Sequence, residues 1–207
     1  GTNKMSSAMG TVVSTARFAR NGYLRGKMLM AACSAAAALI GSALGAHLAL
    51  MVSEEIIKHM MIVVLPIVAF YVLRNKDMGE NEKTGTIPQV KVFAICIAAA
   101  FFIGGYDGFY GPGTGTFLIL VFTGLLKLGT RDAAGISKVV NLSADIGALG
   151  TFFVGGKVDY ALGIAAALFC MAGSYFGAGL VVNNGQKIVR PVVMGVLALL
   201  FVKILAG

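Results

Sequence analysis

The chain has 207 residues, of which 57% are hydrophobic and 13% are charged, and its mean hydropathy is +0.85. A water-soluble domain cannot bury so much apolar surface, so the composition excludes an ordinary soluble enzyme. The formal net charge is +8, but the Lys and Arg residues lie mostly in short connectors between apolar runs. That distribution is typical of the cytoplasmic side of a membrane protein and argues against a nucleic-acid binder.

A helix needs about 20 apolar residues to cross a bilayer, somewhat fewer if it is broken. Spans are expected at 4–18, 27–50, 57–74, 92–107, 114–128, 134–154, 158–182 and 187–205. The first is short and carries Ser, Thr and Gly residues around Lys4, so it should line protein or water, not lipid. The chain opens on Gly1 without a Met, and we expect that an N-terminal segment is missing.

Two related halves are visible in the sequence. Three blocks of residues recur in the same order. The first two recur 134 residues later and the third recurs 132 residues later. The pairs are Gly1–Lys4 with Gly135–Lys138, Phe18 and Gly22 with Phe152 and Gly156, and Gly41–Ala46 with Gly173–Ala178. We therefore expect an all-α, polytopic transmembrane bundle made of two repeats. The first repeat covers 1–74, a polar linker covers 75–91, and the second repeat covers 92–207.

The orientation of the repeats depends on how many spans separate equivalent loops. An odd number of expected spans lies between Gly22 and Gly156, which predicts an inverted repeat. If 92–107 and 114–128 instead form one broken crossing, the repeat is parallel. The inverted arrangement places more Lys and Arg residues on the cytoplasmic side, so we favour it.

The stretch 104–116 is the least helical part of the chain. Pro112 and its neighbouring glycines cannot continue a helix, because proline lacks an amide donor and glycine favours other backbone angles. A helix that restarts near Thr114 would offer free amides and threonine hydroxyls to an anion. The candidate anion-binding residues here are Gly111, Gly113, Thr114, Gly115 and Thr116. An ordinary loop between two spans is the alternative.

Lys4 and Lys138 occupy equivalent positions near the starts of equivalent helices. An ionisable residue within a span is a candidate for function, although a lysine there can also extend to the headgroups. Lys138, Asn141 and Asp145 share one helix face, so Lys138 is the stronger candidate. Asn3 and Ser137, which precede the two lysines, are expected to donate hydrogen bonds to the substrate.

Asp107 and Asp145 are the acids within apolar regions, and both are candidates for proton coupling. No cofactor or metal site is predicted, because the cysteines are isolated and only two histidines are present. The expected partners are a small anion and the lipid bilayer, and a homo-oligomer is compatible with the sequence.

At these residues the chain resembles the sulfite exporter TauE/SafE family of membrane permeases. Three motifs carry the resemblance: Gly1–Lys4, Asp107–Phe117 and Ser137–Leu142. It implies two helical repeats in a bacterial inner membrane and transport of sulfite, thiosulfate or organosulfonates. A similar protein would carry a further glycine-rich break before Gly1.

The sequence therefore predicts a secondary transporter or exporter of small anions. A channel or a non-transporting membrane subunit of a complex is the main alternative. An intramembrane enzyme is disfavoured, since the chain offers no Ser-His-Asp set and no metal cluster.

Overall fold

The protein is described by a computed structural model covering residues 1–53, 55–56, 88–184, 195 and 199. Its elements in these ranges are all helical: α1 (Thr2–Arg20), α2 (Met28–Met51), α4 (Gln89–Phe109), α5 (Thr114–Leu120), a π-helical turn (Val121–Leu125), α6 (Thr130–Val154) and α7 (Tyr160–Asn184). The predicted all-helical fold is confirmed. The span expected at 57–74, nearly all of the span at 187–205 and most of the linker lie outside the described residues.

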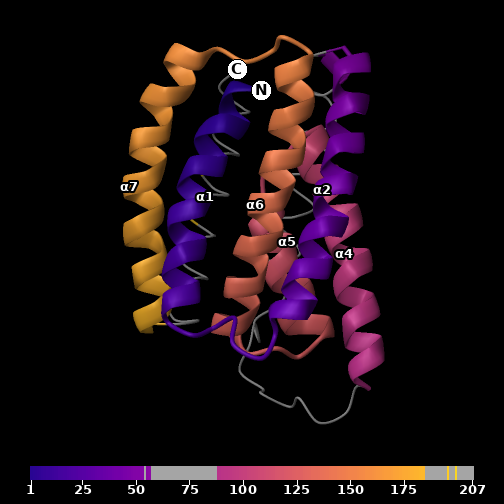
Figure 1. Ribbon diagram of the computed structural model, residues 1–207, viewed down its shortest axis with the longest axis vertical. Helices are drawn as coiled ribbons and strands as arrows, with labels where there is room; N and C mark the ends of the chain where they lie inside the picture. The colour runs from indigo at the N-terminus through magenta and orange to yellow at the C-terminus, as the bar shows by residue number, and fades with distance from the viewer. Residues whose placement is uncertain (54, 57–87, 185–194, 196–198, 200–207) are drawn as a thin grey trace.

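The long helices stand side by side (Figure 1). From one side of the bundle to the other the order is α7, α1, α6, α2 and α4, with α5 against α6. α2, α4 and α7 are long and apolar enough to cross a membrane. α1 and α6, which carry many of the buried polar residues, lie between them, where lipid cannot reach their polar faces.

The first helix behaves as its composition predicts. Lys4, Ser6, Thr11 and Ser14 are all buried in the bundle. The helix ends with Arg17 and Arg20 in its last turn, where positive charge favours the negative end of the helix dipole.

Glycines allow α2 and α4 to approach closely. A Cβ atom added to Gly45 would overlap the carbonyl oxygen of Gly105, and one added to Gly108 would overlap that of Ser42. α2 meets α6 through a hydrogen bond from the Ser42 hydroxyl to the carbonyl oxygen of Ala144. Small residues at such contacts let membrane helices associate by backbone packing.

The helix break is shorter than the sequence predicts. α4 continues to Phe109, so most of the stretch expected to be non-helical is helical, and the break is confined to Tyr110–Gly113. The glycines before Asp107 serve the contact with α2 and do not end the helix. Within the break, Gly111 has φ 99° and Gly113 has φ 86°, values that favour glycine.

Several features agree with an inverted repeat, which stays a prediction. α1 and α6 end in the same turn: Gly22 and Gly156 have φ 79° and 65°, and equivalent backbone bonds close both turns. α1 packs on α7 as α6 packs on α2. The connection from α1 to α2 lies at one end of the bundle and that from α6 to α7 at the other (Figure 1), as oppositely oriented halves require.

Candidate functional site

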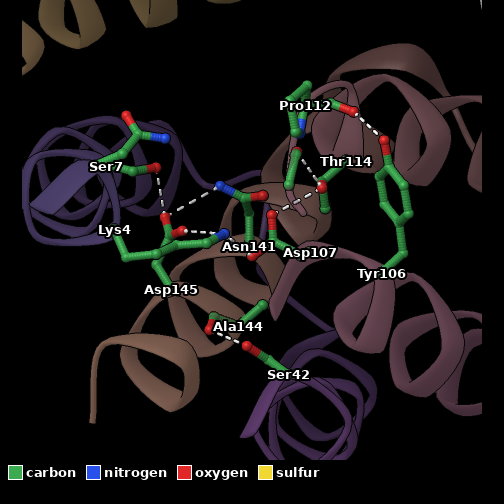
Figure 2. A network of polar contacts seen from close by, with 12 residues as sticks. Lys4, Ser7, Ser42, Tyr106, Asp107, Pro112, Thr114, Asn141, Ala144 and Asp145 are labelled. Atoms are coloured by element: carbon green, nitrogen blue, oxygen red, sulfur yellow. Dashed lines mark hydrogen bonds and ion pairs between the residues drawn. The ribbon is translucent and has the colours of Figure 1, made fainter. Parts of the chain in front are cut away.

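Three charged side chains from three helices meet inside the bundle. The Lys4 ammonium of α1 lies 2.5 Å from an oxygen of Asp107 on α4 and 3.2 Å from an oxygen of Asp145 on α6. Figure 2 shows the lysine reaching into the network that holds both carboxylates. The exposed fractions are 7% for Lys4, 3% for Asp107 and 1% for Asp145. We call these residues the charge triad, and their burial means that each charge depends on the others.

Neutral side chains complete the hydrogen bonding of the triad. The Ser7 hydroxyl donates to Asp145 at 2.7 Å, and longer contacts of 3.4 Å come from Thr11 and from the Asn141 amide. The Thr114 hydroxyl lies 2.7 Å from an oxygen of Asp107 and 2.6 Å from the Gly111 carbonyl oxygen (Figure 2). Each carboxylate therefore has a hydroxyl partner in addition to the lysine, as buried charges require.

The break after α4 makes room for the lysine. A Cβ atom added to Gly111 would lie 3.1 Å from the Lys4 ammonium, and the positive φ of Gly111 also disfavours any other residue. The Tyr106 hydroxyl donates to the Pro112 carbonyl oxygen at 2.7 Å and so holds the break against α4 (Figure 2). In this structure the glycine segment thus shapes the surroundings of Lys4.

Thr114→Val is expected to lower the free energy of unfolding by about 2 kcal/mol, because Asp107 loses a hydrogen bond to a charged acceptor. Thr114→Ser keeps the hydroxyl and should stay close to the parent protein. Thermal unfolding of the detergent-solubilised variants measures the difference. Equal stability of the Val and Ser variants would contradict the role assigned to this hydroxyl.

A separate cavity of about 380 Å³ lies between α1, α5, α6 and α7. Its polar lining residues are Ser14, Thr116, Ser137, Lys138, Asn141 and Ser174. The Ser137 residue is 1% exposed, and its hydroxyl oxygen has no hydrogen-bond partner among the described residues. Lys138 has no hydrogen bond or ion pair within the same ranges. We call this space the Lys138 cavity.

The structure thus divides the predicted site residues between two places. Ser137, Lys138, Asn141, Gly115 and Thr116 line the Lys138 cavity, whereas Lys4, Thr114 and both acids form the triad with its partners. Asn141 belongs to both, since it lines the cavity and its amide contacts Asp145.

The remaining predicted residues lie outside the cavity lining. Gly111 and Gly113 form the break, and Asn3 is exposed, with only its backbone carbonyl engaged by Ser6. No cluster of His, Cys, Asp or Glu suited to a metal occurs among the described residues.

The sequence predicts that the polar residues of the first helix face protein or water, but it does not single out three of them as site residues: Ser7, Thr11 and Ser14. Their spacing of four and three places them on one helix face, which is the signal that identifies them. Ser7 and Thr11 contact Asp145, and Ser14 lines the Lys138 cavity.

Apolar helices around a buried charged centre define a polytopic integral membrane protein. The profile of the sulfite exporter TauE/SafE family matches residues 1–204. The chain therefore belongs to this family of membrane transporters, as the sequence motifs predict.

The relatives carry the same general description. A probable membrane transporter protein, ORF9, from Sinorhizobium sp. is 32% identical over 208 residues, covering 100% of this chain and 77% of the relative. The probable membrane transporter YfcA of Escherichia coli K12 is 29% identical, covering 99% of this chain and 74% of YfcA. No solved structure gives a significant match. A bacterial inner-membrane location is consistent with these relatives.

Proposed function

We propose that the chain transports a small anion, and that the Lys138 cavity is where the anion binds. The observation that carries this proposal is the state of Lys138. Lys138 lines a cavity and has no hydrogen bond or ion pair among the described residues, whereas the equivalent lysine, Lys4, is held by two carboxylates. A charged group inside a membrane protein needs a partner, and an anionic substrate supplies one.

The other cavity residues suit an oxyanion. Ser137 offers a buried hydroxyl without a partner, and Thr116 and Ser174 offer further hydroxyls. Hydroxyl groups can donate to several oxygens of one anion, and donors next to a cation make strong, charge-assisted bonds. A volume of about 380 Å³ exceeds that of a small anion, because one water occupies about 30 Å³ in the liquid.

The substrate class follows from chemistry and from the family. The family is described as sulfite exporters, while its similar relatives are described only as probable membrane transporters. We therefore propose sulfur oxyanions or organosulfonates as substrates, carried by alternating access between the two halves. In this arrangement Lys4 and Thr114 support the site through the triad, and the substrate contacts come from α5, α6 and α7.

Lys138→Ala is expected to weaken thiosulfate binding by about tenfold or more, which corresponds to about 1.4 kcal/mol. The purified protein and its variant are compared by titration calorimetry, and reconstituted liposomes then report thiosulfate flux. Lys91→Ala is the matched control, because Lys91 is exposed on α4 and far in sequence from the cavity residues. Its binding and flux should equal those of the parent protein.

Unchanged thiosulfate binding by Lys138→Ala would contradict the site. The form of the flux separates a carrier from the channel alternative. Saturable flux that is accelerated by thiosulfate on the opposite side supports a carrier, whereas conductance that is linear in concentration indicates a pore.

A further inference from the structure

The charge triad does not balance its own charge. It contains one ammonium and two carboxylates, all within the buried centre of the bundle. One negative charge is therefore left over when both acids are ionised. Water cannot compensate it at this depth, so a neighbouring cation or a bound proton must do so.

Lys138 is the neighbouring cation. It precedes Asp145 by two turns of α6, about 10 Å along the helix axis, so the two residues lie on one face of the helix. Asn141 stands between them, lining the cavity and contacting Asp145 at 3.4 Å. When both lysines and both acids are ionised, the four groups are neutral together, and one of the two lysines lines the cavity.

The polar and charged groups around Asp145 come from α1, α4 and α6. α1 supplies Lys4, Ser7 and Thr11, which contact Asp145, and α4 supplies Asp107, which shares Lys4 with it. α6 supplies Asn141, which contacts Asp145, and Lys138, which lies two turns earlier on the same face. Of these, only Lys4, Asp107 and Lys138 carry charge. The balance at Asp145 therefore depends on whether the charge of Lys138 is available to it.

We propose that the Asp107–Asp145 pair takes up a proton when an anion binds to Lys138, so that anion and proton are transported together. The inference rests on the proposed function and adds the coupling ion to it. An anion that pairs with Lys138 removes the charge that offsets the acid pair. Proton uptake by the pair then restores neutrality, and by linkage a proton on the pair strengthens anion binding equally.

The local hydrogen bonding can accommodate the proton. The proton comes from water and forms an O–H bond on one carboxylate oxygen, while the anion stays intact. A hydroxyl group accepts as well as donates, so Ser7 or Thr11 can accept from a protonated Asp145. Two acids that share one lysine titrate together, and the proton belongs to the pair.

The test measures protons and anion in one experiment. Thiosulfate is titrated into the purified protein at several pH values from about 6 to 8, and at each pH in two buffers with different ionisation enthalpies. Thiosulfate keeps its charge between about pH 6 and pH 8, so any proton exchange belongs to the protein or the buffer. We expect net uptake of up to one proton per thiosulfate bound, and an affinity that rises by up to about tenfold per unit fall in pH.

Asp145→Asn should abolish the proton uptake. The variant should bind thiosulfate at pH 8 about as tightly as the parent protein does at pH 6, since its amide imitates the protonated acid. Asp107→Asn tests the same point if the first variant does not fold. Asp132→Asn is the matched control on the same helix, because Asp132 pairs with Lys27 outside the triad, and it should keep the uptake.

The experiment distinguishes failure of the proton coupling from failure of the proposed function. Thiosulfate binding by the parent protein without proton exchange, or uptake that persists in both Asn variants, overturns the coupling and leaves the anion site intact. Absence of thiosulfate binding by the parent protein overturns the proposed function and the coupling together.

Discussion

Lys4→Ala is expected to lower the free energy of unfolding by about 3 to 5 kcal/mol, the largest effect of any single lysine described here. The substitution leaves Asp107 and Asp145 buried without the ammonium that holds both of them. Two like charges then lie close together at a depth where water does not solvate them. The loss of stability is measured by thermal unfolding of the detergent-solubilised protein, monitored as the disappearance of its monodisperse peak in size-exclusion chromatography.

Two comparisons make this expectation specific. Lys4→Ala combined with Asp145→Asn should recover part of the lost stability, because only one acid then remains. Lys138→Ala is the matched lysine variant, and it should lose less stability than Lys4→Ala, since Lys138 has no direct ion pair among the described residues and the acid pair can bind a proton in its place. Equal destabilisation by the two lysine variants would contradict the division between triad and cavity.

Gly45→Leu is expected to cost about 3 kcal/mol or more, at the upper end of the range for overpacking. Any side chain at this position meets the Gly105 carbonyl oxygen, which belongs to the backbone and cannot move alone. The helices α2 and α4 must therefore separate, and the contact of Gly108 with Ser42 is lost as well. A displaced α4 also moves Asp107 away from Lys4.

The control for this variant is Gly150→Leu. Gly150 lies within α6 and no atom of the described residues lies within 4 Å of a Cβ added there. Leucine also favours a helix over glycine by roughly 1 kcal/mol, so this variant should be as stable as the parent protein or slightly more so. Thermal unfolding compares the two leucine variants directly. Similar melting temperatures would show that the α2–α4 contact is not as close as the structure indicates.

The sequence predicts the helices well where their apolar runs are continuous. The spans expected at 27–50 and 134–154 correspond to α2 and α6 within a few residues. It is less accurate near Gly104 and Gly105, which are helical although the glycine content suggests otherwise. Glycine lowers helix propensity locally, but close packing against another helix compensates for this cost, and such packing leaves no mark in one segment alone.

The candidate site, like the fold, could be predicted where it depends on local spacing and not where it depends on helix packing. The residues of one face of α6, Lys138, Asn141 and Asp145, could be grouped from their spacing, because helix geometry is local. The sequence ranked Lys138 above Lys4 for its polar companions, and it did not show that Lys4 would be paired. Along the chain, Lys4 lies 103 residues from Asp107 and 141 residues from Asp145.

Hydropathy, glycine positions and short motifs are properties of neighbouring residues, so they were enough to identify a helical membrane protein of the TauE/SafE family. The two lysines of the recurring sequence motif could not be told apart in this way, and their different surroundings, an ion pair for Lys4 and a cavity for Lys138, came from the packing of the helices. An ion pair depends on helices brought together in space, and among the described residues Asp107 and Asp145 form ion pairs with Lys4 and with no other cation.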